Sequence, residues 1–173
     1  MSDMGTSLGP LEWSGDRWTV GDYSRPYGDW LVFRADGLYQ RTRTEELLIP
    51  WSRIMLGPRF TLGEKHPKSG NYGPMAMLGG LPGPWKGIGR GYLHMTLRHP
   101  YEDRVVAFNR HPRWYDMTEL ALFGALLAHT GHAKKVHKFG DADWVGHAIG
   151  QLLRQRPRKL REIERVMDEI LQA

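Results

Sequence analysis

The chain contains eight histidines, the residue type with the widest range of possible chemistry in this sequence. A neutral imidazole can bind zinc, copper or nickel, and it can transfer protons near neutral pH. His129, His132 and His137 lie close together in the sequence, but no histidine stands in an H-E-x-x-H or comparable metal-binding spacing. The dipole of a helix also favours histidines near its C-terminus when no ligand is bound. We therefore predict no metal site and no cofactor.

The other reactive side chains do not form a catalytic set. None of the serines stands in a G-x-S-x-G turn, and the early aspartates stand mostly at turns, where they bond to the backbone. The glycine-rich string GIGRG at residues 87–91 lacks the GKS or GKT sequence of a phosphate-binding loop. We predict no catalytic residue and a non-enzymatic protein. A small enzyme, with a site formed by the long central loop and a histidine such as His94, is one alternative.

The chain contains no cysteine, which excludes disulfides, thiol catalysis and cysteine-ligated zinc. Its start, MSDMGTSLGP, has neither the basic nor the apolar region of a signal peptide. No run approaches the roughly 18 apolar residues that span a bilayer. These features predict a cytoplasmic protein without a transmembrane segment.

Basic charge is concentrated in two parts of the chain, whose formal net charge is +5. Residues 57–116 carry nine basic and four acidic side chains, and the run RQRPRKLR at residues 154–161 has five basic side chains and no acid. A positive surface of this kind favours an anionic partner. The predicted partner-binding residues are Lys65, Lys68, Trp85, Lys86, Arg90, Arg154, Arg156, Arg158, Lys159 and Arg161.

Residues 57–91 contain ten glycines and five prolines, which predicts a long loop in place of a regular element. Loops of this length inside a domain are often functional. The first five predicted partner-binding residues stand in this loop, which makes it a candidate contact surface.

The first part of the chain has the short apolar runs and frequent turn residues of β-strands. The pair Asp36-Gly37 separates two such runs and predicts a tight hairpin, with positive φ values at the turn. A second hairpin is predicted over residues 91–109. Five aromatic side chains of the first strands could stack on nucleic-acid bases, although alternating aromatics more often belong to a sheet core. They are Trp13, Trp18, Tyr23, Tyr27 and Trp30.

Three helices are predicted in the last part of the chain. The first covers residues 117–129, with Asp116 as its N-cap and Gly131 at its end. A second helix follows Asp141, and a third covers residues 159–171. The third helix has an apolar seam that needs a partner, either the rest of this chain or a second copy of it.

The order of these elements over residues 16–130 resembles the bacterial pleckstrin-homology-like domains. Two segments carry the resemblance, namely the hairpin and bend FRADGLYQRTRTEELLIPWSRI and the strand and helix RVVAFNRHPRWYDMTELALFGALL. The resemblance implies an α+β fold with an antiparallel, partly closed β-barrel capped by a helix. It also implies a scaffold that binds a peptide, a protein or a lipid headgroup and performs no catalysis.

We accordingly predict a barrel domain over residues 1–130 and a basic, helical extension over residues 131–173. The predicted function is a binding module that contacts a protein or an anionic partner through the central loop and the basic C-terminal helices. A nucleic-acid-associated protein that uses the run at residues 154–161 on phosphates is the second alternative. Self-association through the last helix is a further prediction.

Overall fold

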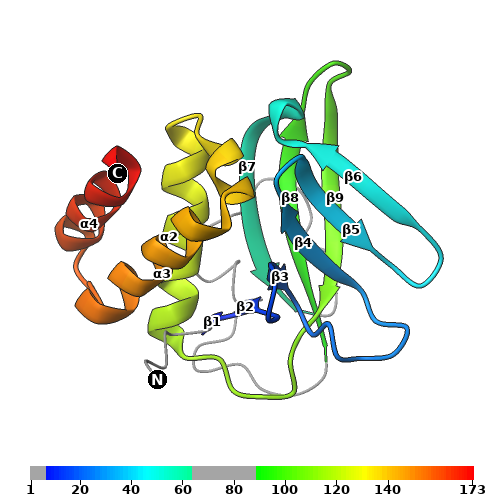
Figure 1. Ribbon diagram of the computed structural model, residues 1–173, viewed down its shortest axis with the longest axis horizontal. Coiled ribbons are helices and arrows are strands. Elements are labelled where there is room, and N and C mark those ends of the chain that lie inside the picture. Colours follow the sequence, from blue (N-terminus) through cyan, green and yellow to red (C-terminus); the bar gives the residue numbers. More distant parts are fainter. Residues whose placement is uncertain (1–6, 64–88) are drawn as a thin grey trace.

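Two antiparallel sheets and three α-helices build the protein, in the computed structural model that describes residues 7–63 and 89–173 (Figure 1). The larger sheet has six strands in sequence order: β1 (Ser7–Leu8), β2 (Leu11–Trp13), β3 (Trp18–Val20), β4 (Trp30–Arg34), β5 (Gly37–Arg41) and β6 (Glu46–Pro50). The smaller sheet has three: β7 (Ile54–Leu62), β8 (Arg90–Leu97) and β9 (Glu102–Asn109). The fold is therefore α+β, as predicted. Among the described residues the two sheets stay separate, and no closed barrel is found.

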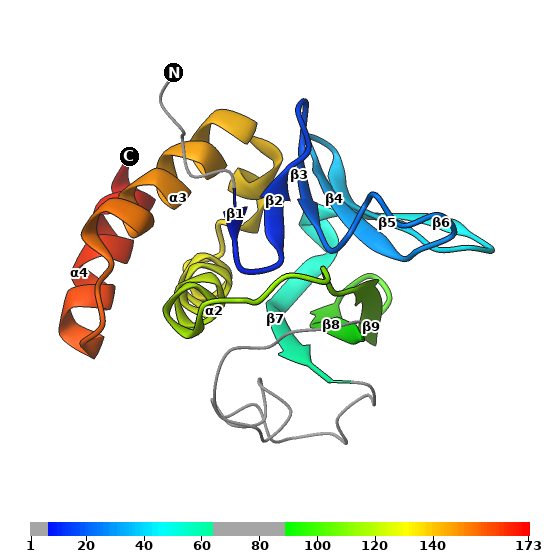
Figure 2. The ribbon, with the colours of Figure 1, turned by 90° about the horizontal axis from the view of Figure 1, so that it is seen from below.

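The helices lie together on one side of the sheets (Figure 1). They are α2 (Met117–His132), α3 (Ala142–Gln155) and α4 (Leu160–Gln172), with short 3₁₀ turns at η1 (Trp51–Arg53) and η2 (Val136–Gly140). Figure 2 shows α2 next to β7, and α3 and α4 as an outer layer farther from the smaller sheet. One continuous apolar core runs from Leu8 to Leu171, so side chains from both predicted parts of the chain share it.

The β4–β5 hairpin is confirmed, but its turn lies one residue earlier than predicted. Arg34 pairs with Gly37, which leaves Ala35 and Asp36 as the turn, and none of these residues has a positive φ. Gly37 is needed for another reason. A Cβ on it would overlap the backbone carbonyl of Ile49 on the neighbouring strand, so the absence of a side chain permits a close approach between β5 and β6.

The predicted loop over residues 57–91 is wrong at both of its ends. Strand β7 continues to Leu62, where it pairs with Gly91 of β8, and β8 itself begins at Arg90. Register shifts between Ile54 and Arg59 absorb Gly57 and Pro58, since a bulge lets a strand accommodate a residue without a pairing N–H. Gly57 and Pro58 therefore lie in an irregular part of strand β7 and do not begin a loop.

Helix α2 connects the smaller sheet to the other helices. Asp116 caps its first turn as predicted, because its carboxylate accepts hydrogen bonds from the backbone N–H groups of Thr118 and Glu119. The helix continues past Gly131, which was predicted to end it. A Cβ at Gly131 would overlap the Gly57 carbonyl oxygen, so this glycine allows α2 to lie against β7.

Helix α4 buries its apolar seam within the same chain. Val166, Met167, Ile170 and Leu171 are buried against the rest of the fold, and the neighbours of α4 are α2 and α3. Polar donors fix the C-terminal end of the helix, where backbone carbonyls lack partners within the helix. Lys135 Nζ donates to the Leu171 carbonyl at 3.0 Å, and Trp144 Nε1 donates to that of Ile170 at 3.3 Å.

Candidate functional site

The basic run at residues 154–161 forms the turn between α3 and α4, which we call the basic turn. Arg156 follows the end of α3 in a left-handed conformation with φ 41°, and its guanidinium reaches Asp116 at 3.3 Å from Nη2 to Oδ2. Pro157 is buried and ends the helical path. The turn is therefore anchored to the start of α2 by one of its own arginines.

Four cations of the basic turn face solvent. Arg154, Arg158, Lys159 and Arg161 are exposed, and none forms an ion pair with any residue that the structure describes. Lys159 is the N-cap residue of α4 and makes no side-chain capping bond. Arg154 lies in the last turn of α3, where the helix dipole favours a cation, but Arg158, Lys159 and Arg161 lie at the N-terminus of α4, where positive charge opposes the dipole. Helix stability therefore does not explain these three cations. The arrangement can hold an anionic group.

Of the other predicted partner-binding residues the structure describes Arg90, which does not join the basic turn. Arg90 begins β8 in the smaller sheet, where Nη1 lies 3.4 Å from Asp29 Oδ2. Its charge is thus matched within the protein. Lys65, Lys68, Trp85 and Lys86 lie outside the described residues.

Asp116 is the residue on which the anchoring of the basic turn depends. Partial burial opposes ionisation, but the backbone N–H groups of Glu119 and Thr118 and the Arg156 guanidinium outweigh it, so the pKa of Asp116 is lowered. We expect Asp116→Ala to lose about 1–2 kcal/mol of unfolding free energy, because it removes the helix cap and an ion pair. Asp116→Asn keeps a capping oxygen and should lose about 0.5 kcal/mol or less. Urea unfolding of both variants measures this, and equal losses would contradict a separate cap contribution.

His94, the histidine of the enzyme alternative, is buried on β8. Its Nε2 lies 3.0 Å from Thr61 Oγ1 on the adjacent strand, which is a cross-strand contact within the smaller sheet. His129 lies on α2 and lines a shallow groove with Asp168 of α4. Within residues 7–63 and 89–173, no three histidine or carboxylate side chains gather as a metal site would require.

A buried hydrogen-bonded cluster joins β2 to the segment between β9 and α2. His111 Nε2 lies 2.8 Å from Glu12 Oε2, and His111 Nδ1 lies 2.7 Å from the Tyr115 hydroxyl. Burial raises the pKa of Tyr115 to about 12, so the phenol is neutral and can donate to Nδ1 while Nε2–H donates to Glu12. Such a relay could move protons, but none of the three side chains lines the grooves of the larger sheet described below. Its contacts connect β2 to the segment between β9 and α2.

The cluster makes stability depend on pH. Burial, together with the charge of Arg113, lowers the pKa of His111 from its usual 6.5 in spite of Glu12. Below about pH 6.5 the His111 imidazole therefore binds a proton more readily in the unfolded chain than in the folded chain, and the free energy of unfolding falls as the pH drops. We expect His111→Gln to flatten this slope, by at most about 1.4 kcal/mol per pH unit for one proton. His137→Gln, at an exposed position, should leave it unchanged, and denaturant unfolding across this pH range would show both.

A second surface, which the sequence analysis did not identify as a site, lies on the outer face of the larger sheet. Strand alternation places Trp30 and Tyr39 there, and arginine side chains cover both rings. The Arg41 guanidinium lies 4.4 Å from the Trp30 ring centroid, and that of Arg34 lies 5.3 Å from the Tyr39 ring centroid. We call Arg17, Trp30, Arg34, Tyr39 and Arg41 the arginine–aromatic face. The alternation of aromatic and arginine residues along residues 30–41 was the available signal.

Comparison with known proteins gives no further guide to function. No model of a known protein family matches the chain, and neither a curated protein nor a solved structure matches it. None of the helices in the described ranges is both long enough and apolar enough to cross a membrane.

Proposed function

We propose that the protein is a non-enzymatic binding module whose basic turn contacts an acidic segment of a partner protein. The observation that carries this proposal is the set of four exposed cations without ion-pair partners among the described residues, in a turn that Arg156 anchors to Asp116. The ion pair already restricts the conformations of the turn, so less conformational entropy is lost when the turn binds a ligand.

The size of the positive patch favours an acidic protein segment over a nucleic acid. Just beyond the basic turn, α4 exposes four carboxylates, of which Glu169 is paired with Arg165. They are Glu162, Glu164, Asp168 and Glu169. Nucleic acid binding depends on many phosphate contacts along a continuous positive surface. A short acidic segment needs only the few cations of the turn, whereas a nucleic acid that extended along α4 would meet these carboxylates.

A pleckstrin-homology-like plan, with a partly closed barrel capped by a helix, remains part of this proposal. The order of elements supports it, since the six-stranded sheet is followed by the three-stranded sheet and then by α2. Such a plan would agree with a binding role, although fold analogy does not identify a ligand. The enzyme alternative has less support, because His94 is engaged with Thr61.

Self-association through α4 is the other predicted contact. Docking of the helix leaves Leu160 exposed and Ile163 partly buried, so only these apolar side chains could meet a second copy. Sedimentation of the full chain and of Ile163→Asp tests this idea, and a dimer that the substitution leaves unchanged would exclude it.

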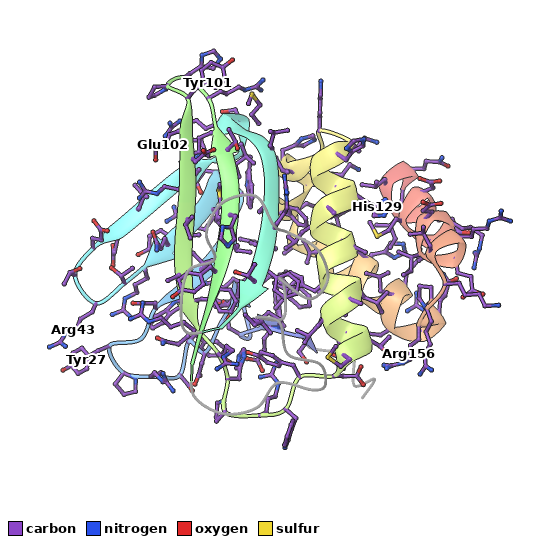
Figure 3. The ribbon with its side chains drawn as sticks, turned by 180° about the vertical axis from the view of Figure 1, so that it is seen from behind. Tyr27, Arg43, Tyr101, Glu102, His129 and Arg156 are labelled. Carbon is purple, nitrogen blue, oxygen red and sulfur yellow. The ribbon has the colours of Figure 1, made fainter. Side chains whose placement is uncertain are left out.

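The binding proposal is tested with a fluorescent deca-glutamate peptide and the double variant Arg158→Gln/Lys159→Gln. We expect about tenfold weaker peptide binding, because two charge contacts of roughly 0.5–1 kcal/mol each are lost. The control variant Arg43→Gln/Lys134→Gln removes the same charge at other exposed positions and should bind normally. In Figure 3, Arg43 and Arg156 lie at opposite sides of the molecule.

Two results of this experiment would contradict the proposal. An equal loss of peptide affinity in the double variant and in the control variant would mean that binding depends only on the net charge of the protein. Stronger binding of a mixed-sequence oligonucleotide, with the steep salt dependence of phosphate contacts and loss in the same double variant, would favour the nucleic-acid alternative.

A further inference from the structure

The outer face of the larger sheet holds an open groove that the basic turn does not share. Two adjoining hollows of about 480 and 680 Å³ have Asp16, Arg17 and Val32 in common, and the larger one also reaches Gly140 and Ala142, where η2 leads into α3. Val32 and Thr19 form the floor of the groove and are almost fully buried. From Trp30 to Arg34 the groove follows β4 for about 14 Å, at roughly 3.4 Å per residue. It is long enough for an extended ligand.

The walls of the groove are aromatic on one side. Trp30 and Tyr39 line the hollow of about 480 Å³, and their rings are held by the arginines that cover them. The same combination recurs outside the two hollows, where Arg43 lies 5.8 Å from the Tyr27 ring centroid. Figure 3 shows these two side chains next to each other at the edge of the molecule. Each arginine lies over one face of its ring, so the apolar surface available to a ligand that also carries polar groups is the part of the ring that the arginine does not cover.

Two of the three arginines of the groove are paired with carboxylates. Asp16 receives two hydrogen bonds from Arg17, at 3.1 Å from Nε and 2.9 Å from Nη2, and these bonds lower the pKa of Asp16. Asp36 pairs in the same way with Arg34, at 3.1 Å from Nε and 3.2 Å from Nη2. Arg41 stands opposite Glu46 in the strand register. Arg17 and Arg34 are therefore already paired with neighbouring carboxylates, whereas the Arg41 guanidinium lies over the Trp30 ring and forms no ion pair with a described residue.

We propose that this groove binds an uncharged glycan chain. Sugar hydroxyls both donate and accept hydrogen bonds, so an arginine–carboxylate pair can serve one hydroxyl with its donor and the next with its acceptor. The apolar C–H faces of the sugar rings pack on Trp30 and Tyr39. A nucleic acid fits less well, because its phosphates would have to displace the carboxylates. An extended peptide usually pairs with the edge of a sheet, because its backbone groups need partners that a sheet face does not offer.

Affinity electrophoresis in native gels that contain a neutral β-glucan, xylan, galactomannan or glycogen tests the proposal. We expect at least one of these polysaccharides to retard the full chain, with less than about twofold change on adding salt, since no net charge is involved. Trp30→Ala should weaken the retardation at least tenfold. Asp16 is exposed and does not belong to the core, so its substitution should not disturb the fold. Asp16→Ala should weaken the retardation severalfold.

Tyr101→Ala is the matched control, because it removes an aromatic side chain that is 74% exposed at the β8–β9 hairpin and lines neither hollow. It should leave the retardation unchanged. If no polysaccharide retards the protein, or if Tyr101→Ala and Trp30→Ala have equal effects, the proposal is wrong. Salt-sensitive binding of a single-stranded oligonucleotide at this groove would also overturn it. Arg158→Gln/Lys159→Gln should bind the glycan normally, so the glycan proposal and the proposed function can fail separately.

Discussion

Val166→Asp is expected to lose at least about 3 kcal/mol of unfolding free energy, because it places a carboxylate without a partner where α4 meets the rest of the core. Val166 is fully buried on the side of α4 that packs within the chain. Urea unfolding measures the loss. For a domain whose total stability is of the usual 5–15 kcal/mol, the effect is large.

Leu160→Asp is the matched control on the same helix. Leu160 is 70% exposed, so the same new charge stays in water and should change the stability by no more than about 0.5 kcal/mol. If the two variants were equally stable, α4 would not be docked as described. The comparison also shows why removal of residues 154–173 is a poor test of binding, since it would take core side chains away together with the basic turn.

Phe123→Ala should lose about 3–5 kcal/mol, because it leaves a cavity between α2 and the smaller sheet. Phe123 is fully buried, and its ring centroid lies 4.9 Å from that of Phe60 on β7. Phe123→Leu fills most of the space and should lose about 1.5 kcal/mol or less. Denaturant unfolding of both variants distinguishes a packing role from a general loss of helix, which would affect the two variants alike.

Local patterns in the sequence predicted much of the fold. The hairpin at β4–β5, the cap at Asp116 and the three helices are all present, because each depends on residues that are neighbours in the chain. Errors arose where a distant segment decides the structure. Gly131 stays within α2 because the Gly57 carbonyl lies against it, and residues 57–62 are a strand because β8 pairs with them.

The candidate sites also differ in whether they depend on neighbouring residues in the sequence or on distant segments. The basic turn could be identified from a continuous run of charge, and the structure keeps that run in one exposed turn. The arginine–aromatic face could be identified only in part, because residues 30–41 carry four of its members but Arg17 joins them only through the order of strands in the larger sheet. Lys135 and Lys138 belong to the predicted basic extension over residues 131–173, yet both donate to carbonyl oxygens at the C-terminal end of α4, those of Leu171 and Ala173. Charge alone does not distinguish a binding residue from a structural one.

The most direct test of the proposed function is an NMR titration of the full chain with deca-glutamate peptide, followed at the backbone amides. We predict shifts concentrated at residues 154–161 and at the start of α4, which shrink between about 50 and 200 mM salt, because exposed charge contacts are screened. The amides of β3, β4 and β5 should not move. Shifts on those strands in place of the basic turn, or no shifts at low salt, would contradict the proposal.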